Sequence, residues 1–117
     1  MSRKTREDKA LSLLGLARRA GAVAVGTASA RRSLRAGDAR LLLTANDASP
    51  GQLGKVIRLA RRRDVPCRAL ADRSRLGRAL GGSPVSAVAV TSESFADRLL
   101  DRLAPTEGSE LEGAQRR

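Results

Sequence analysis

The sequence GTASARRSLRAG, which begins at Gly26, holds residues whose types and spacing suit the binding of an anion. Gly26 and Thr27 stand at the expected start of a helix, where free backbone N–H groups and the helix dipole attract phosphate or base acceptor groups. On that helix Arg31 and Arg35 are four residues apart. Arg32 and Arg35 are three apart, so each pair shares a face. A solvated helix face is the plainer interpretation, but the coincidence of charge, helix start and adjoining loop favours binding.

Catalytic chemistry has fewer candidate residues. The chain contains no histidine, which removes the usual general base and the commonest metal ligand. Asp47 is the most suggestive carboxylate, because it follows an expected strand at the end where α/β folds place ligands. A turn or helix-capping role for Asp47 is the interpretation that we favour. The chain has no glycine-rich phosphate-binding motif, and its serines lack a triad. We therefore expect no enzymatic activity, no cofactor and no bound metal.

The composition points to a polyanionic partner. The 117 residues include 23 Lys and Arg against 12 Asp and Glu, which gives a formal net charge of +11. Only three of the 23 are lysine, and arginine forks onto phosphates in a bidentate manner. An arginine-biased genome explains the ratio of Arg to Lys but not the excess over acids. Residues 1–80 hold 19 of the basic side chains and 6 of the acidic ones, so the charge belongs to that part of the chain.

The scarcity of aromatic residues restricts the manner of nucleic-acid binding. The chain has one Phe and neither Trp nor Tyr. Single-strand platforms stack bases on such rings, so this chain is unsuited to that mode. We expect instead that backbone groups, arginine and polar side chains contact a structured, already bent RNA, with a strong dependence on salt.

The same composition bears on compartment and redox chemistry. No apolar run reaches the roughly 18 residues of a membrane span, and the start MSRKTREDK is too polar for a signal peptide. We expect a cytoplasmic protein with no membrane partner. The single Cys67 provides neither an intramolecular disulfide nor a cysteine metal site, and VPCRAL is typical of a buried strand with a packed thiol.

Helical and strand patterns alternate along the chain. The expected helices run from Lys9 to Gly21, from a Thr27 cap to Gly37, from a Ser49 cap and Pro50 to residue 63, from an Asp72 cap to Gly81, and from a Ser92 cap to Leu103. The expected strands are 22–25, 39–45, 65–70 and 86–92. This alternation predicts a single α/β/α sandwich around a mainly parallel sheet. The expected organisation is a polar N-terminal segment at 1–8, one domain at 9–103 and a disordered tail at 104–117.

Several spaced strings together resemble a known family. They are LSLLGLARRAG, GTASARRSLRAGDARLLLTANDASP, DVPCRAL, SRLGRALGG and VSAVAVT. The pattern resembles the L7Ae and L30e superfamily of ribosomal proteins and kink-turn RNA binders, in its bacterial YlxQ-like branch, over residues 9–103. The resemblance implies a three-layer α/β/α fold with a four-stranded mixed sheet.

The resemblance also implies where RNA contacts lie. The family motif Gly-x-Asn-Glu-x-x-Lys falls on the stretch that begins at Gly26, and Arg32 stands at its Lys position. Ala28 and Ser29 occupy the Asn and Glu positions and lack the side chains that read the sheared G·A pairs of a kink-turn. Phosphate attraction is retained at this motif, whereas base readout by those two side chains is not carried over.

Two further loops correspond to contact loops of the family. The loop after the second strand corresponds to Asn46 and Asp47. The loop after the third strand corresponds to Leu70, Ala71, Asp72 and Arg73, where a small apolar surface and a basic residue are expected to face the bend of the RNA.

These observations predict a non-enzymatic, monomeric RNA-binding protein whose partner is ribosomal or other structured RNA, including kink-turn RNA. The interaction is expected at the start of the second helix and the adjoining loops. The alternative is a protein-interaction module on the same fold that docks on a ribosome or a transcription complex, which the Ala28 and Ser29 departures favour.

Overall fold

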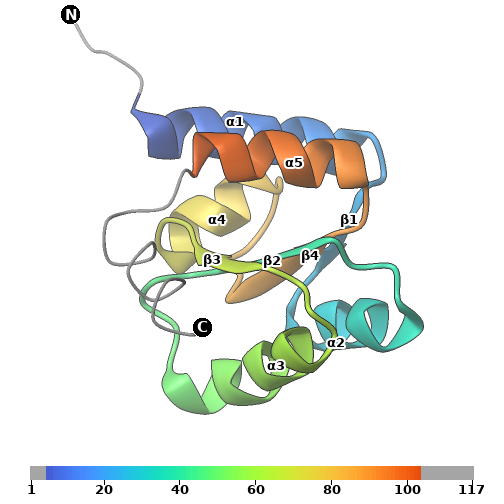
Figure 1. Ribbon diagram of the computed structural model, residues 1–117. Coiled ribbons are helices and arrows are strands. Elements are labelled where there is room, and N and C mark those ends of the chain that lie inside the picture. Colours follow the sequence, from blue (N-terminus) through green and yellow to red (C-terminus); the bar gives the residue numbers. More distant parts are fainter. Residues whose placement is uncertain (1–4, 104–117) are drawn as a thin grey trace, which may run out of the picture.

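Helices and strands alternate along residues 5–103, which are the part of the chain that the computed structural model describes. The strands form one four-stranded sheet and are β1 (Val23–Val25), β2 (Leu41–Thr44), β3 (Cys67–Ala69) and β4 (Ala87–Val90). The helices are α1 (Arg6–Arg19), α2 (Thr27–Ala36), α3 (Pro50–Arg62), α4 (Arg73–Ala79) and α5 (Glu93–Arg102). Helices α1, α4 and α5 lie on one face of the sheet, and α2 and α3 lie on the other (Figure 1). The three-layer α/β/α sandwich is therefore confirmed.

The direction of β4 makes the sheet mixed. The strand order is β1-β4-β2-β3, and β4 runs antiparallel to both of its neighbours while β2 and β3 are parallel. The mixed sheet implied by the family resemblance is confirmed, and the mainly parallel sheet expected from alternation is wrong. The physical reason lies in the connection through α4. The chain returns to the edge that it left, where the Val85 N–H donates to the Arg73 carbonyl at 3.1 Å, and β4 starts there.

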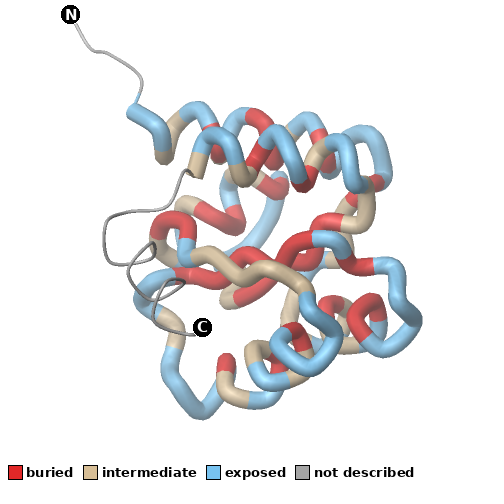
Figure 2. Tube along the Cα trace, in the orientation of Figure 1, coloured by how far each residue is buried: buried red, intermediate tan, exposed pale blue. Residues whose placement is uncertain are grey.

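The sheet is buried between two aliphatic clusters. Every residue of β2 and β4 is buried, as expected for strands covered on both faces. Leu41, Leu43 and Val88 point toward α1, α4 and α5, whereas Leu42 and Ala89 point toward α2 and α3. Buried positions accordingly line the inner sides of the helices and the sheet (Figure 2). Leu, Ala and Val thus fill the core.

Side-chain caps mark four of the helix starts among the described residues. Ser49, Asp72 and Ser92 accept from backbone N–H groups three residues on, which confirms these predicted caps. Helix α1 begins at Arg6, three residues before the apolar periodicity starts, because Thr5 and Asp8 form a reciprocal capping box. The expected tail at 104–117 lies outside the described residues.

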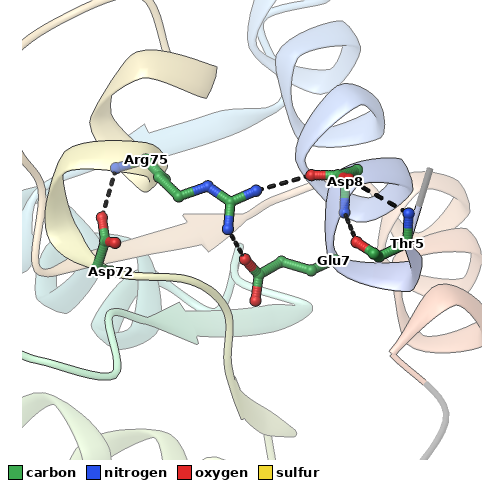
Figure 3. A network of polar contacts seen from close by, with 5 residues as sticks. All are labelled: Thr5, Glu7, Asp8, Asp72 and Arg75. Carbon is green, nitrogen blue, oxygen red and sulfur yellow. Dashed lines mark hydrogen bonds and ion pairs between the residues drawn. The ribbon is translucent and has the colours of Figure 1, made fainter. Parts of the chain in front are cut away.

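A polar network joins the start of α1 to α4 (Figure 3). The Arg75 guanidinium forms ion pairs with Glu7 and with Asp8, the latter at 2.7 Å between Nη2 and Oδ1. The Arg75 backbone N–H donates to Asp72 Oδ1 at 2.8 Å. This network fixes the first turn of α4, which directly follows one of the expected contact loops.

Candidate nucleic-acid interface

One edge of the sheet collects the loops that the sequence pattern singled out. Strands β1, β2 and β3 end there and β4 begins there, so Val25, Thr44 and Ala69 lie on the same side as Ala87. We call this the loop edge; it comprises Gly26–Ser29, Asn46–Asp47, Gln52, Leu70–Arg73 and Ser86. It faces away from the edge at which α1 ends.

Backbone hydrogen bonds tie the loop edge together. The Gly26 N–H donates to the Ala87 carbonyl at 2.8 Å, and the Ala45 N–H donates to the Ser86 carbonyl at 2.8 Å. The Asn46 N–H donates to the Ala71 carbonyl, also at 2.8 Å. Three loops far apart in the sequence are thus held in fixed relative positions, as expected for a preorganised binding surface.

The start of α2 presents free hydrogen-bond donors. Gly26 is the N-cap residue, with φ 96° and ψ 157°, and no side chain caps this helix. The predicted Thr27 cap is wrong, because the helix begins at Thr27 itself. The first intrahelical bond runs from the Ala30 N–H to the Gly26 carbonyl at 2.8 Å. Among the described residues, no acceptor pairs with the N–H groups of Thr27, Ala28 or Ser29.

The arginines of α2 lie at different distances from this helix start. Arg32 is exposed, and its Nη2 donates to Ser29 Oγ at 3.0 Å, which holds the guanidinium beside the free N–H groups. Arg31 is half-buried, and its Nε has no partner among the described residues. Arg35 is exposed on the last turn, about 12 Å further along the helix axis at 1.5 Å per residue. The structure therefore brings Arg32 to the loop edge and leaves Arg35 away from it.

Asp47 and Arg73 link the second and third loops. Asp47 Oδ1 accepts from the Arg73 backbone N–H at 2.9 Å, and Arg73 Nε lies 3.6 Å from the same oxygen. Asp72 caps α4 through the Arg75 N–H. Asp47 thus engages the first residue of α4 across the loop edge. The sequence favoured Asp47 as a turn or cap residue ahead of the third helix; Ser49 caps that helix instead, and Asp47 bonds to the start of α4.

The apolar contact surface expected in the third loop is wrong. Leu70 and Ala71 are only 2% and 3% exposed and belong to the core cluster beneath α1 and α4. What this loop offers to the surface is the exposed Arg73 and the half-buried Asp72. Ala71 has a left-handed backbone, with φ 60°, which turns its carbonyl toward the Asn46 N–H. The two apolar residues anchor the loop rather than face a ligand.

Two polar residues of the loop edge were missed from the sequence. Ser86 Oγ donates to Gln52 Oε1 at 3.3 Å, so the start of β4 contacts the first turn of α3. The antiparallel direction of β4 brings Ser86 to this edge, and the alternating pattern did not predict that direction. Gln52 is exposed in the first turn of α3, one turn after the Ser49 cap. Its place beside a predicted helix cap was the sequence signal that could have identified it as a surface residue of this edge.

Other arginines, and Cys67, lie away from the loop edge. Arg18 and Arg19 end α1, and Arg63 lines a hollow of about 270 Å³ with Gly37 and Arg40 at the opposite edge of the sheet. The buried strand expected for VPCRAL is wrong, because β3 lies at the edge of the sheet and Cys67 is only half-buried there. Burial still raises the pKa of the Cys67 thiol.

Metal-binding clusters and membrane-spanning helices are both absent from the described residues. Within residues 5–103, no group of three or more His, Cys, Asp or Glu side chains is placed to hold a metal ion. None of the helices in that same range combines the length and the apolar character that a membrane span requires.

The arrangement defines a class of protein: a small α/β/α sandwich whose loop edge presents free N–H donors beside arginine, a surface for anionic or acceptor-rich ligands. The chain belongs to the ribosomal protein L7Ae/L30e/S12e/Gadd45 family, which it matches over residues 8–100. The resemblance drawn from the sequence is thereby confirmed.

Relatives and solved structures agree with this assignment. The chain is 36% identical over 91 residues to the RNA-binding protein YlxQ of Bacillus subtilis, covering 78% of this chain and 91% of that protein. A protein of unknown function from Bacillus halodurans superposes with a TM-score of 0.79 at 27% identity, over 83% of this chain and 98% of that one. The 15.5-kDa RNA-binding protein of Giardia lamblia has the same fold, with a TM-score of 0.75 at 18% identity, over 95% and 92% of the two chains.

Proposed function

We propose that this protein binds structured RNA through the loop edge. The observation that carries the proposal is the uncapped start of α2, where the N–H groups of Thr27, Ala28 and Ser29 lie beside the Arg32 guanidinium. N–H donors and a helix N-terminus attract phosphate and base acceptor atoms, and arginine adds a bidentate phosphate contact. A relative named as an RNA-binding protein and a net charge of +11 support the same conclusion.

The preferred RNA is bent rather than single-stranded. The only aromatic side chain, Phe95, lies on α5 under the Arg98 guanidinium, so the loop edge offers no ring for base stacking. Its donors are instead fixed by backbone hydrogen bonds and suit an RNA whose backbone already curves around them. We propose a kink-turn or a similarly bent element as the target, with ribosomal RNA as a candidate source.

A matched pair of substitutions at Ala28 tests this proposal. Ala28 is exposed in the first turn of α2, where a carboxylate is favourable to the helix dipole but repels phosphate. Ala28→Asp should therefore retain or gain stability while losing about tenfold in RNA affinity, or about 1.4 kcal/mol. Ala28→Asn is the isosteric uncharged control; because Asn stands at this position in the family motif, it should bind the kink-turn RNA at least as tightly as wild type. Electrophoretic shifts on a kink-turn RNA and on a straight duplex measure both.

The outcomes separate the two classes of function. Equal binding of both RNAs would reduce the proposal to general polyanion binding. Absence of binding to either RNA at low salt, or identical affinities of the Asp and Asn variants, would contradict it. In that case a protein partner captured after nuclease treatment would favour the interaction-module alternative.

A further inference from the structure

The layer formed by α2 and α3 carries basic residues on its outer side that the loop edge does not use. The exposed members are Arg35, Lys55, Arg58 and Arg62, and we call them the outer basic face. Lys55, Arg58 and Arg62 recur at three- and four-residue steps, opposite the buried Leu53, Val56 and Ala60. The two helices therefore turn charge outward along their lengths.

Both helices lead away from the loop edge. Gly26 and Gln52, at their starts, contact Ala87 and Ser86 at that edge. Their ends meet at the opposite edge, where Leu34 and Gly37 from the first helix line one hollow with Arg63 from the second. At 1.5 Å per residue α2 is about 15 Å long and α3 about 20 Å. A ligand held at the loop edge has this face as its continuation.

The charge of this face is uncompensated. Neither α2 nor α3 contains an acidic residue, and none of their arginines or Lys55 forms an ion pair within residues 5–103. On α5, by contrast, Arg98 and Arg102 alternate with Asp97 and Asp101. The two layers thus present different fields to a polyanion, and the basic one is continuous with the loop edge.

The helix dipole accounts for only part of this pattern. Cations in a last turn stabilise a helix, which explains Arg61 and Arg62 at the end of α3. The dipole effect fades beyond that turn and does not explain Lys55 or Arg58 in the middle of the helix. Mid-helix charge that neither the dipole nor an ion pair explains forms a basic stripe of the kind that attracts phosphates.

We propose that the outer basic face is a second RNA-binding surface, which contacts the phosphates of a duplex stem that extends from the RNA held at the loop edge. The inference rests on the proposed function. It adds that the RNA must carry a helical stem long enough to reach α3. Contact is with backbone phosphates, so the stem's length matters and its sequence does not.

The test compares two bent RNAs that differ only in one stem, kept short or extended by about one helical turn. Wild type should bind the extended RNA about tenfold more tightly. Arg58→Gln with Arg62→Gln should abolish that gain and leave the affinity for the short RNA within about twofold. The same double variant should reduce the salt slope on the extended RNA by about 0.9 for each phosphate that the protein no longer neutralises.

A charge-matched control uses the opposite layer. Arg98→Gln with Arg102→Gln removes two arginines at the same four-residue spacing from α5 and should leave both RNAs bound as in wild type. Equal losses in the two double variants would show a long-range charge effect and would overturn the proposal, as would no loss in the α3 variant. If the Ala28→Asp variant loses binding while stem length has no effect, RNA binding at the loop edge is supported and stem binding by the outer basic face is contradicted. If wild type binds neither RNA, both proposals fail.

Discussion

Gly26 determines how the start of α2 meets the sheet. Its backbone, at φ 96° and ψ 157°, lies in a region that only glycine occupies without strain. In that conformation its N–H bonds to Ala87 and its carbonyl accepts from Ala30, which leaves the next three N–H groups directed outward. Side chains cap the other four described helices, so the open donors of α2 follow from one residue.

Replacing this glycine should therefore cost stability without any steric clash. A Cβ at Gly26 would meet no atom within 4 Å, so the whole effect of Gly26→Ala arises from the backbone. We expect a loss of about 1–3 kcal/mol in the free energy of unfolding, measured by urea denaturation. Gly82→Ala is the control, since Gly82 is exposed, lacks a positive φ and also has open space at its Cβ; it should change stability by less than about 0.5 kcal/mol. Equal stabilities of the two variants would mean that this backbone conformation is not required.

Elements show where sequence patterns suffice and where they fail. Caps and apolar spacing predicted each helix and strand, because these signals act within a few residues. β4 is antiparallel because the chain returns through α4 to the end of the sheet at which β3 stops, and no local pattern encodes that return. Ser86 was missed for that reason, and the burial of Leu70 beneath α1 was missed because it depends on the packing of a whole layer. The ion pairs of Arg75 with Glu7 and Asp8 are likewise tertiary, at a sequence separation of nearly seventy residues.

The link between α1 and α4 should make stability depend on pH. Hydrogen bonding to Thr5, chiefly through its backbone N–H, and the Arg75 guanidinium lower the pKa of Asp8 below 3.8. Because the pKa of Asp8 is lower in the folded state, the ionised carboxylate stabilises the fold above about pH 4. This stabilisation is lost as the pH falls and the carboxylate is protonated.

Asp8→Asn should thus be less stable than wild type near pH 7, and the difference should shrink toward zero by about pH 2. Asp97→Asn, which removes an exposed carboxylate of α5 that forms no ion pair within residues 5–103, is the control for the loss of one negative charge in the same urea titrations. A difference between wild type and Asp8→Asn that stayed constant with pH would refute the electrostatic origin.

In the whole molecule, the residues that pack the core and the residues proposed to bind RNA lie in different places. Two aliphatic clusters hold the sheet between helices, and the loops at one edge are fixed by backbone hydrogen bonds. Net charge alone predicted a polyanionic partner, but it did not show that α2 and α3 carry basic residues and no acidic ones. That layer is basic throughout, whereas α5 mixes both signs. A polyanion should consequently approach from one side and from one edge.

This asymmetry predicts which backbone amides respond to RNA. In a titration followed by ¹H–¹⁵N correlation spectra, a bent RNA with short stems should shift the amides of Thr27–Ser29 and Asn46, which lie on the loop edge. An extended stem should additionally shift amides around Arg58, while those of α5 (Glu93–Arg102) stay in place with either RNA. The α5 amides serve as an internal control, because they belong to the same folded molecule under the same salt. If the largest shifts fell in α5, the RNA would bind the opposite layer. Its phosphates would then contact neither the free N–H donors of α2 nor the basic residues of α3, which would contradict both proposals.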